Sequence, residues 1–136
     1  MADTLEIAQA GDSLSGADIQ ASIDALRRMA NDMEALKTES VSVEDLQAVG
    51  RTQSDLLAMA GELVNMQVDL LVGKAKITGE HIDAAVSFAN NVIEQVTGIR
   101  KRIQQITAVL AFLAVVLTGN GEAILGAAFT LKDALA

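Results

Sequence analysis

The residues of this chain that could do chemistry centre on one histidine. His81 is the only histidine; it follows Glu80, and Asp83 lies two positions further on. Imidazole and carboxylate groups bind metal ions and transfer protons. Di-metal bundles, however, repeat Glu-x-x-His on paired helices, and zinc sites need further histidine or cysteine ligands. The chain has neither that spacing nor any cysteine, so the sequence predicts no metal site.

Nucleophilic and acidic residues elsewhere lack the partners that catalysis needs. Ser22, Ser54 and Ser87 fall in expected helices without a matched general base. Glu94 lies beside polar residues, which is typical of a solvated face. No glycine-rich loop ends in Lys-Ser or Lys-Thr, the pattern of a phosphate-binding loop. We therefore expect a non-enzymatic protein with no cofactor and no small-molecule substrate.

Composition and charge narrow the class of protein further. The 136 residues are the length of one domain and include no proline, which favours long helices. Residues 1–71 carry 13 acidic and 4 basic side chains, and the net charge of the chain is −8. Nucleic-acid binding needs a basic surface, so we expect no nucleic-acid partner.

Apolar periodicity predicts an all-α fold, an elongated bundle or hairpin of helices. Ser42 and Thr78 are expected helix N-caps, and residues 73–79 a break or a bend. The second expected helix also carries a second apolar face of Leu57, Val64, Val68 and Leu71. On its main stripe lie two glutamines, Gln53 and Gln67, which either fix the register of packing or turn to the edge of the stripe. Residues 1–15 have no sustained period and are expected to be a flexible arm. The expected helices span residues 17–37, 43–72, 79–117 and 122–135.

The longest apolar stripe predicts a long third helix. Its members follow one another at steps of three and four residues, the seam of a helix that packs on other helices. An unbroken helix over residues 79–117 would be about 60 Å long at 1.5 Å per residue. The stripe consists of Ile82, Ala85, Ala89, Val92, Val96, Ile99, Ile103, Ile106, Leu110, Leu113 and Leu117.

The end of that stripe is apolar on nearly every side. Between residues 106 and 131 the only charged residue is Glu122. The sequence predicts an apolar C-terminal helical hairpin over residues 106–136, with its turn at residues 119–121. The uninterrupted apolar run, residues 106–117, is shorter than the roughly 20 residues that cross a bilayer. The expected assembly or membrane contacts are Ile99, Ile103, Ile106, Leu110, Leu113, Leu117, Ile124 and Phe129.

This apolar hairpin could be buried in either of two environments, in protein or in lipid. In the first, the protein is a self-assembling homo-oligomer or filament subunit. In the second, it is a small pore-former, translocator or membrane-anchored helper that inserts residues 106–131. A basic cluster before an apolar run is typical of a membrane flank, and Arg100, Lys101 and Arg102 would then contact head groups. A third class is an adaptor or chaperone whose acidic N-terminal half binds a basic partner.

One segment resembles a known family. Residues 55–74, from Asp55-Leu-Leu-Ala-Met-Ala to Leu-Leu-Val-Gly-Lys74, are similar to the C-terminal region of the inner-rod proteins of bacterial type III secretion systems. The resemblance implies a self-assembling helical component of a secretion or injection assembly, exported without a Sec signal. Inner-rod proteins end soon after their second helix, whereas this chain continues through residues 106–136.

The function expected from the sequence is therefore self-assembly, with the protein itself as partner, and membrane activity is the alternative. The first residues, Met-Ala-Asp-Thr-Leu-Glu, lack the basic and apolar regions of a signal peptide. We expect synthesis in the cytoplasm without a Sec signal, with membrane association or export by a non-Sec route both open.

Overall fold

Helices make up most of the chain in the computed structural model, which describes residues 19–37 and 42–136. Within that part the helices are α2 (Gln20–Leu36), α3 (Val43–Leu63), α4 (Gly79–Glu94), α5 (Ile99–Leu117) and α6 (Gly121–Leu135). Strands β1 (Asp69–Val72) and β2 (Ala75–Thr78) form an antiparallel ribbon. The predominantly helical fold is thus confirmed, with a small sheet added. The arm expected at residues 1–15 lies outside the described residues.

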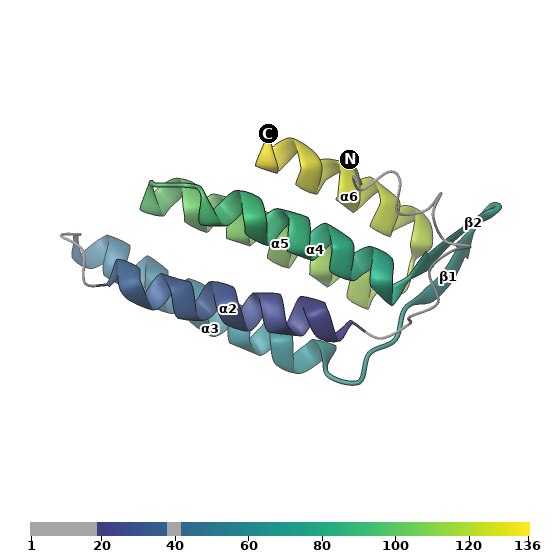
Figure 1. The fold of residues 1–136 in the computed structure, drawn as a ribbon, viewed down its shortest axis with the longest axis horizontal. Helices are drawn as coiled ribbons and strands as arrows, with labels where there is room; N and C mark the ends of the chain where they lie inside the picture. The colour runs from purple at the N-terminus through teal and green to yellow at the C-terminus, as the bar shows by residue number, and fades with distance from the viewer. Residues whose placement is uncertain (1–18, 38–41) are drawn as a thin grey trace.

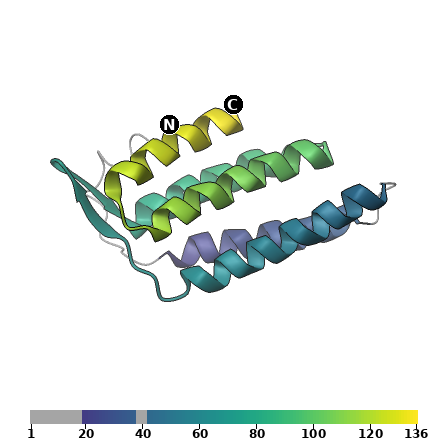
Figure 2. The ribbon, with the colours of Figure 1, turned by 180° about the vertical axis from the view of Figure 1, so that it is seen from behind.

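The helices lie side by side with their long axes roughly aligned (Figure 1). α2 packs on α3 and on α4, and α5 packs on α3, α4 and α6. Seen from behind, α3 and α5 form the near side of the molecule and α6 runs along the opposite edge from α3 (Figure 2). The ribbon extends from one end of the helices in both views.

One continuous core joins all five described helices. Its largest fully buried side chains include Leu26 on α2, Leu56 on α3, Ile82 on α4, Phe112 on α5 and Ile124 on α6. Burying such aliphatic and aromatic side chains contributes about 1.5–3 kcal/mol each. Every helix therefore contributes one apolar face to the same core.

The second expected helix ends nine residues early, so the prediction of a helix over residues 43–72 is wrong at its C-terminal end. Its start is confirmed, because the Ser42 hydroxyl accepts a hydrogen bond from the Asp45 backbone at 3.1 Å. α3 stops at Leu63, and Asn65 takes a φ of 64°, the left-handed conformation that ends many helices. Residues 69–72 then form β1, and Gly73 (φ 61°) begins the two-residue turn to β2.

The expected unbroken helix over residues 79–117 is also wrong. α4 ends at Glu94 and α5 begins at Ile99, so the two halves of the predicted seam fold back and pack on each other. Arg102 stabilises this reversal, because its guanidinium donates to the carbonyls of Glu94 and Val96 at 3.2 and 3.1 Å. These carbonyls lie at the end of α4, where helical partners are missing.

The expected start of the third helix and the position of the last helix agree with the structure. Thr78 is the N-cap of α4, and α6 begins one residue before the expected start. α5 and α6 are joined by a tight turn in which Gly119 has a φ of 72°. Asn120 caps α6 by accepting from the Ala123 backbone at 3.0 Å. α2 starts at Gln20, and residues 17 and 18 of the first expected helix lie outside the described residues.

Candidate assembly surface

The lone histidine has a structural position. His81 is 1% exposed, and its Nδ1 accepts a hydrogen bond from the Thr78 backbone at 2.7 Å. The ring therefore closes the first turn of α4 as part of a capping box. Among the described residues, no three histidine, aspartate or glutamate side chains lie close enough together to hold a metal ion.

The basic cluster is split among different environments. Arg102 contacts the end of α4, and Arg100 lies 3.5 Å from Asp45 on α3, whereas Lys101 faces solvent. Two of the three side chains expected at lipid head groups thus contact the chain itself. No helix in residues 19–37 and 42–136 has both the length and the apolar character needed to cross a bilayer.

The expected contact residues of α5 and α6 divide into buried and exposed groups. Ile106, Leu113 and Ile124 are buried in the core, and Ile99, Ile103 and Leu110 are partly buried against it. These side chains pack against other residues of the same chain, and they could contact another molecule only if the core opened. Only Leu117 and Phe129 of the set are exposed.

Between α5 and α6 lies an apolar groove of about 340 Å³. Small residues widen it, because Ala108 and Ala111 on α5 face Ala123 and Ala127 on α6. None of its lining side chains is charged, and its one hydroxyl, that of Thr130, donates to the Gly126 carbonyl at 3.2 Å.

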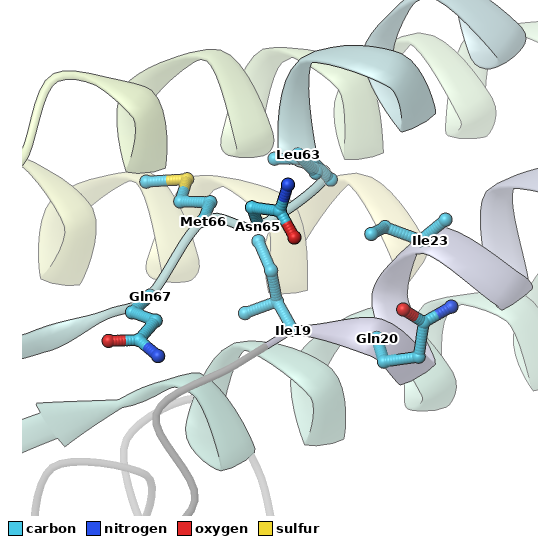
Figure 3. Close-up of a pocket in the computed structure, with 7 residues that line it drawn as sticks. All are labelled: Ile19, Gln20, Ile23, Leu63, Asn65, Met66 and Gln67. Atoms are coloured by element: carbon cyan, nitrogen blue, oxygen red, sulfur yellow. The ribbon is translucent and has the colours of Figure 1, made fainter.

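A second pocket, of about 330 Å³, lies where α2 begins and α3 ends (Figure 3). Its polar groups are the amides of Gln20, Asn65 and Gln67, and Ile19 and Leu63 supply apolar surface. None of its lining side chains is a nucleophile, an acid or a base. Ile19 is also the first described residue here, so the lining is known only for the described part of the chain.

The most extensive exposed apolar feature of the described residues lies along α3. Four of the seven exposed large apolar side chains belong to it: Val43 (69% exposed), Leu46 (37%), Leu57 (54%) and the C-cap residue Val64 (48%). With Gly50 and Gly61, they lie within an arc of about 60°, given 3.6 residues per turn. We call these six residues, Val43, Leu46, Gly50, Leu57, Gly61 and Val64, the α3 stripe.

Polar side chains border the α3 stripe on both sides. On the side of α2, the Gln53 amide donates to the Ala30 carbonyl at 2.9 Å and to the Glu34 carboxylate at 3.3 Å. On the other side, Gly50 lies in a shallow depression of about 440 Å³ lined also by Gln47, Arg51, Ser54 and Asp55. The stripe is therefore a narrow apolar band that runs between polar borders, as on a helix that packs against another helix.

The sequence contained part of the signal for this surface. Leu57 and Val64 belong to the second apolar face expected on this helix. Which of the two faces becomes buried depends on where α2 and α5 pack, and they cover Val49, Leu56 and Leu63 instead. Gln53, one of the two glutamines expected on the seam, lies at the border of the stripe and bridges to α2, whereas Gln67 lies beyond the C-terminal end of α3.

No protein-family model, no curated protein and no solved structure matches the chain.

Proposed function

We propose that this protein is a non-enzymatic self-assembling helical protein, a homo-oligomer or the subunit of a filament. The observation that carries the proposal is the α3 stripe, an apolar band along a helix of 21 residues that the described part of the chain leaves exposed. Exposed apolar side chains that line up along one helix face between polar borders are typical of a protein interaction site. Burial of that surface against another helix removes it from water.

The polar chemistry of the described residues supports the same class. His81 closes a helix turn and Asp83 binds the start of α2, so both have structural partners. The resemblance of residues 55–74 to inner-rod proteins points to assembly as well, because it implies a self-assembling component of a secretion or injection assembly. Those residues include the C-terminal half of the α3 stripe.

Membrane insertion of residues 106–131 is the competing function, and the fold makes it costly. Ile106, Leu113 and Ile124 would have to leave the core to reach lipid. Lipid would restore their apolar surroundings, so the cost lies in separating α5 and α6 from α3 and α4, whose buried faces would then meet water. Self-assembly through α3 needs no such opening.

Size-exclusion chromatography with light scattering, without detergent, tests the proposal. We expect the wild-type chain to elute with a mass of two or more chains, and Leu57→Asp to shift it toward one chain. Leu117→Asp is the control, because Leu117 is also an exposed leucine, although at 37% against 54% for Leu57, and lies on α5. A wild-type monomer, or an equal effect of both variants, would count against assembly through α3.

Flotation with anionic liposomes distinguishes self-assembly from membrane insertion. If the proposal is right, the folded protein does not bind the liposomes and stays at the bottom of the gradient. Flotation that disappears in a Leu110→Glu/Leu113→Glu variant, while Leu57→Asp floats like wild type, would favour the membrane function instead.

A further inference from the structure

The packing of residues 19–37 and 42–136 does not explain the two glycines of the α3 stripe. A Cβ built at Gly50 or Gly61 meets no atom within 4 Å. Glycine inside a helix is less favourable than alanine, since it has more backbone freedom to lose. Both positions thus weaken α3 and open space that nothing in the described chain fills.

The stripe is complementary to itself when it is read from its two ends. Its members are separated by 3, 4, 7, 4 and 3 residues, which is a symmetrical set of gaps. From the N-terminal end the order of residue types is Val, Leu, Gly, Leu, Gly, Val. From the C-terminal end it is Val, Gly, Leu, Gly, Leu, Val, so a glycine stands wherever the first order has a leucine, and the reverse. A second copy that lies antiparallel therefore presents a leucine at every glycine.

We infer that two copies of this protein pair through α3, antiparallel and about a twofold axis that passes between Gln53 and Ser54. In this register Val43 contacts the partner's Val64, Leu46 contacts the partner's Gly61, and Gly50 contacts the partner's Leu57. The interface is isologous, so every contact is made twice. The inference rests on the proposed function and specifies its partner, helix and register.

The surface around Gly50 fits the leucine that this register brings to it. The depression of about 440 Å³ over Gly50 is open to the outside, and the partner's Leu57 enters it as a knob enters a hole. The same twofold axis brings Arg51 near the partner's Asp55, because both residues lie on the same border of the stripe. Both side chains line the depression, so the ion pair forms at its rim.

A parallel pairing of the same helices fits less well. It would place Gly50 opposite the partner's Gly50 and Leu57 opposite the partner's Leu57. Two glycines face to face leave a void, and voids forfeit the dispersion contacts that close packing supplies. It would also separate Arg51 from the partner's Asp55, because a twofold axis parallel to the helices brings the Arg51 border of one copy against the Gln53 border of the other.

Exchange of a leucine and a glycine tests the register without a change of composition. Gly50→Leu fills the depression, and we expect at least about a tenfold loss of association, since the partner's Leu57 no longer fits. The double variant Gly50→Leu/Leu57→Gly has the large and small positions reversed, and we expect it to regain most of that association. Gly126→Leu on α6 is the matched control, because a Cβ there also meets open space.

Cysteine cross-linking of the 136-residue chain, which contains no cysteine, determines the direction of the pairing. With a short bifunctional thiol reagent, Ser54→Cys should cross-link to its own copy, and the exposed Ser87→Cys on α4 should not. Val43→Cys alone should not cross-link, whereas a mixture of Val43→Cys and Val64→Cys should give the mixed dimer.

The outcomes separate this inference from the proposed function. Mixed Val43→Cys and Val64→Cys dimers, with rescue by the leucine–glycine exchange, support both. An oligomer in which Val43→Cys cross-links to itself, or which the exchange does not restore, overturns the antiparallel register and leaves self-assembly standing. A chain that stays monomeric overturns both.

Discussion

Asp83 on α4 holds the first turn of α2 through Ser22. The backbone N–H of Ser22 donates to Asp83 Oδ1 at 2.9 Å, and the Ser22 hydroxyl donates to the same oxygen at 2.5 Å. α2 has no side-chain cap from its own N-cap residue, Ile19. A carboxylate from another helix thus satisfies an N–H group that the helix itself leaves open.

Asp83→Ala should therefore destabilise the fold and loosen α2 in particular. We expect the free energy of unfolding in urea to fall by about 1–3 kcal/mol, since a part-buried donor loses a charged acceptor. Ser22→Ala removes only the hydroxyl bond and should cost less. Asp24→Ala, on the exposed side of α2, is the control and should change stability by no more than about 0.5 kcal/mol. Equal effects of Asp83→Ala and Asp24→Ala would contradict the capping role.

Arg102 should be the residue of the basic cluster on which the α4–α5 reversal depends most. Arg102→Ala removes two charge-assisted hydrogen bonds to carbonyls at the end of α4, and we expect a loss of about 1–3 kcal/mol in unfolding free energy. Hydrogen exchange should rise first near residues 94–98. The neighbouring Lys101→Ala should have almost no effect, and a larger effect of Lys101→Ala would show that the reversal is held by other contacts.

The ribbon is expected to depend on a close approach to α6. A Cβ at Gly121 would overlap Cγ2 of Val72 on β1, and valine is too stiff to move aside easily. Gly121→Ala should lower the thermal midpoint and increase exchange of the β1 amides. Gly126→Ala, further along the same helix, meets open space and should raise stability by up to about 1 kcal/mol. Opposite signs for the two variants are the expected result, and the same sign for both would contradict it.

The buried amide of Gln105 should lower the stability of the fold. It is buried, and its Oε1 has no hydrogen-bond partner among the described residues. Gln105→Met keeps a similar shape and removes the buried amide, so we expect stability to increase by about 1 kcal/mol or more. A decrease on urea unfolding would indicate that an ordered water or a further residue satisfies the amide.

The sequence was a reliable guide to the helical fold class and to the starts of α3, α4 and α6. Ser42 and Thr78 begin helices as expected because N-capping depends on residues close in sequence. The break at residues 95–98 was missed because the apolar stripe continues in phase from Val92 to Ile99 across it. The contact that stabilises the reversal, Arg102 on the carbonyls of Glu94 and Val96, forms only once the chain has folded back.

The ribbon and the assembly surface show two other limits. The apolar run at residues 68–72 is short, and a short run suits a strand as well as a helix. Gly73-Lys74 was the local signal for a hairpin turn. On α3 the sequence marked two apolar faces, yet only the packing of α2 and α5 decides that Leu56 is buried and Leu57 exposed.

Sedimentation equilibrium of the wild-type chain, in buffer without detergent, tests self-assembly most directly. The protein concentration should be varied from roughly 1 µM to roughly 1 mM, which covers the dissociation constants expected of small interfaces. We predict an average mass that rises with concentration to at least twice that of one chain, and a weaker rise for Gly50→Leu. A mass of one chain throughout this range would contradict the account.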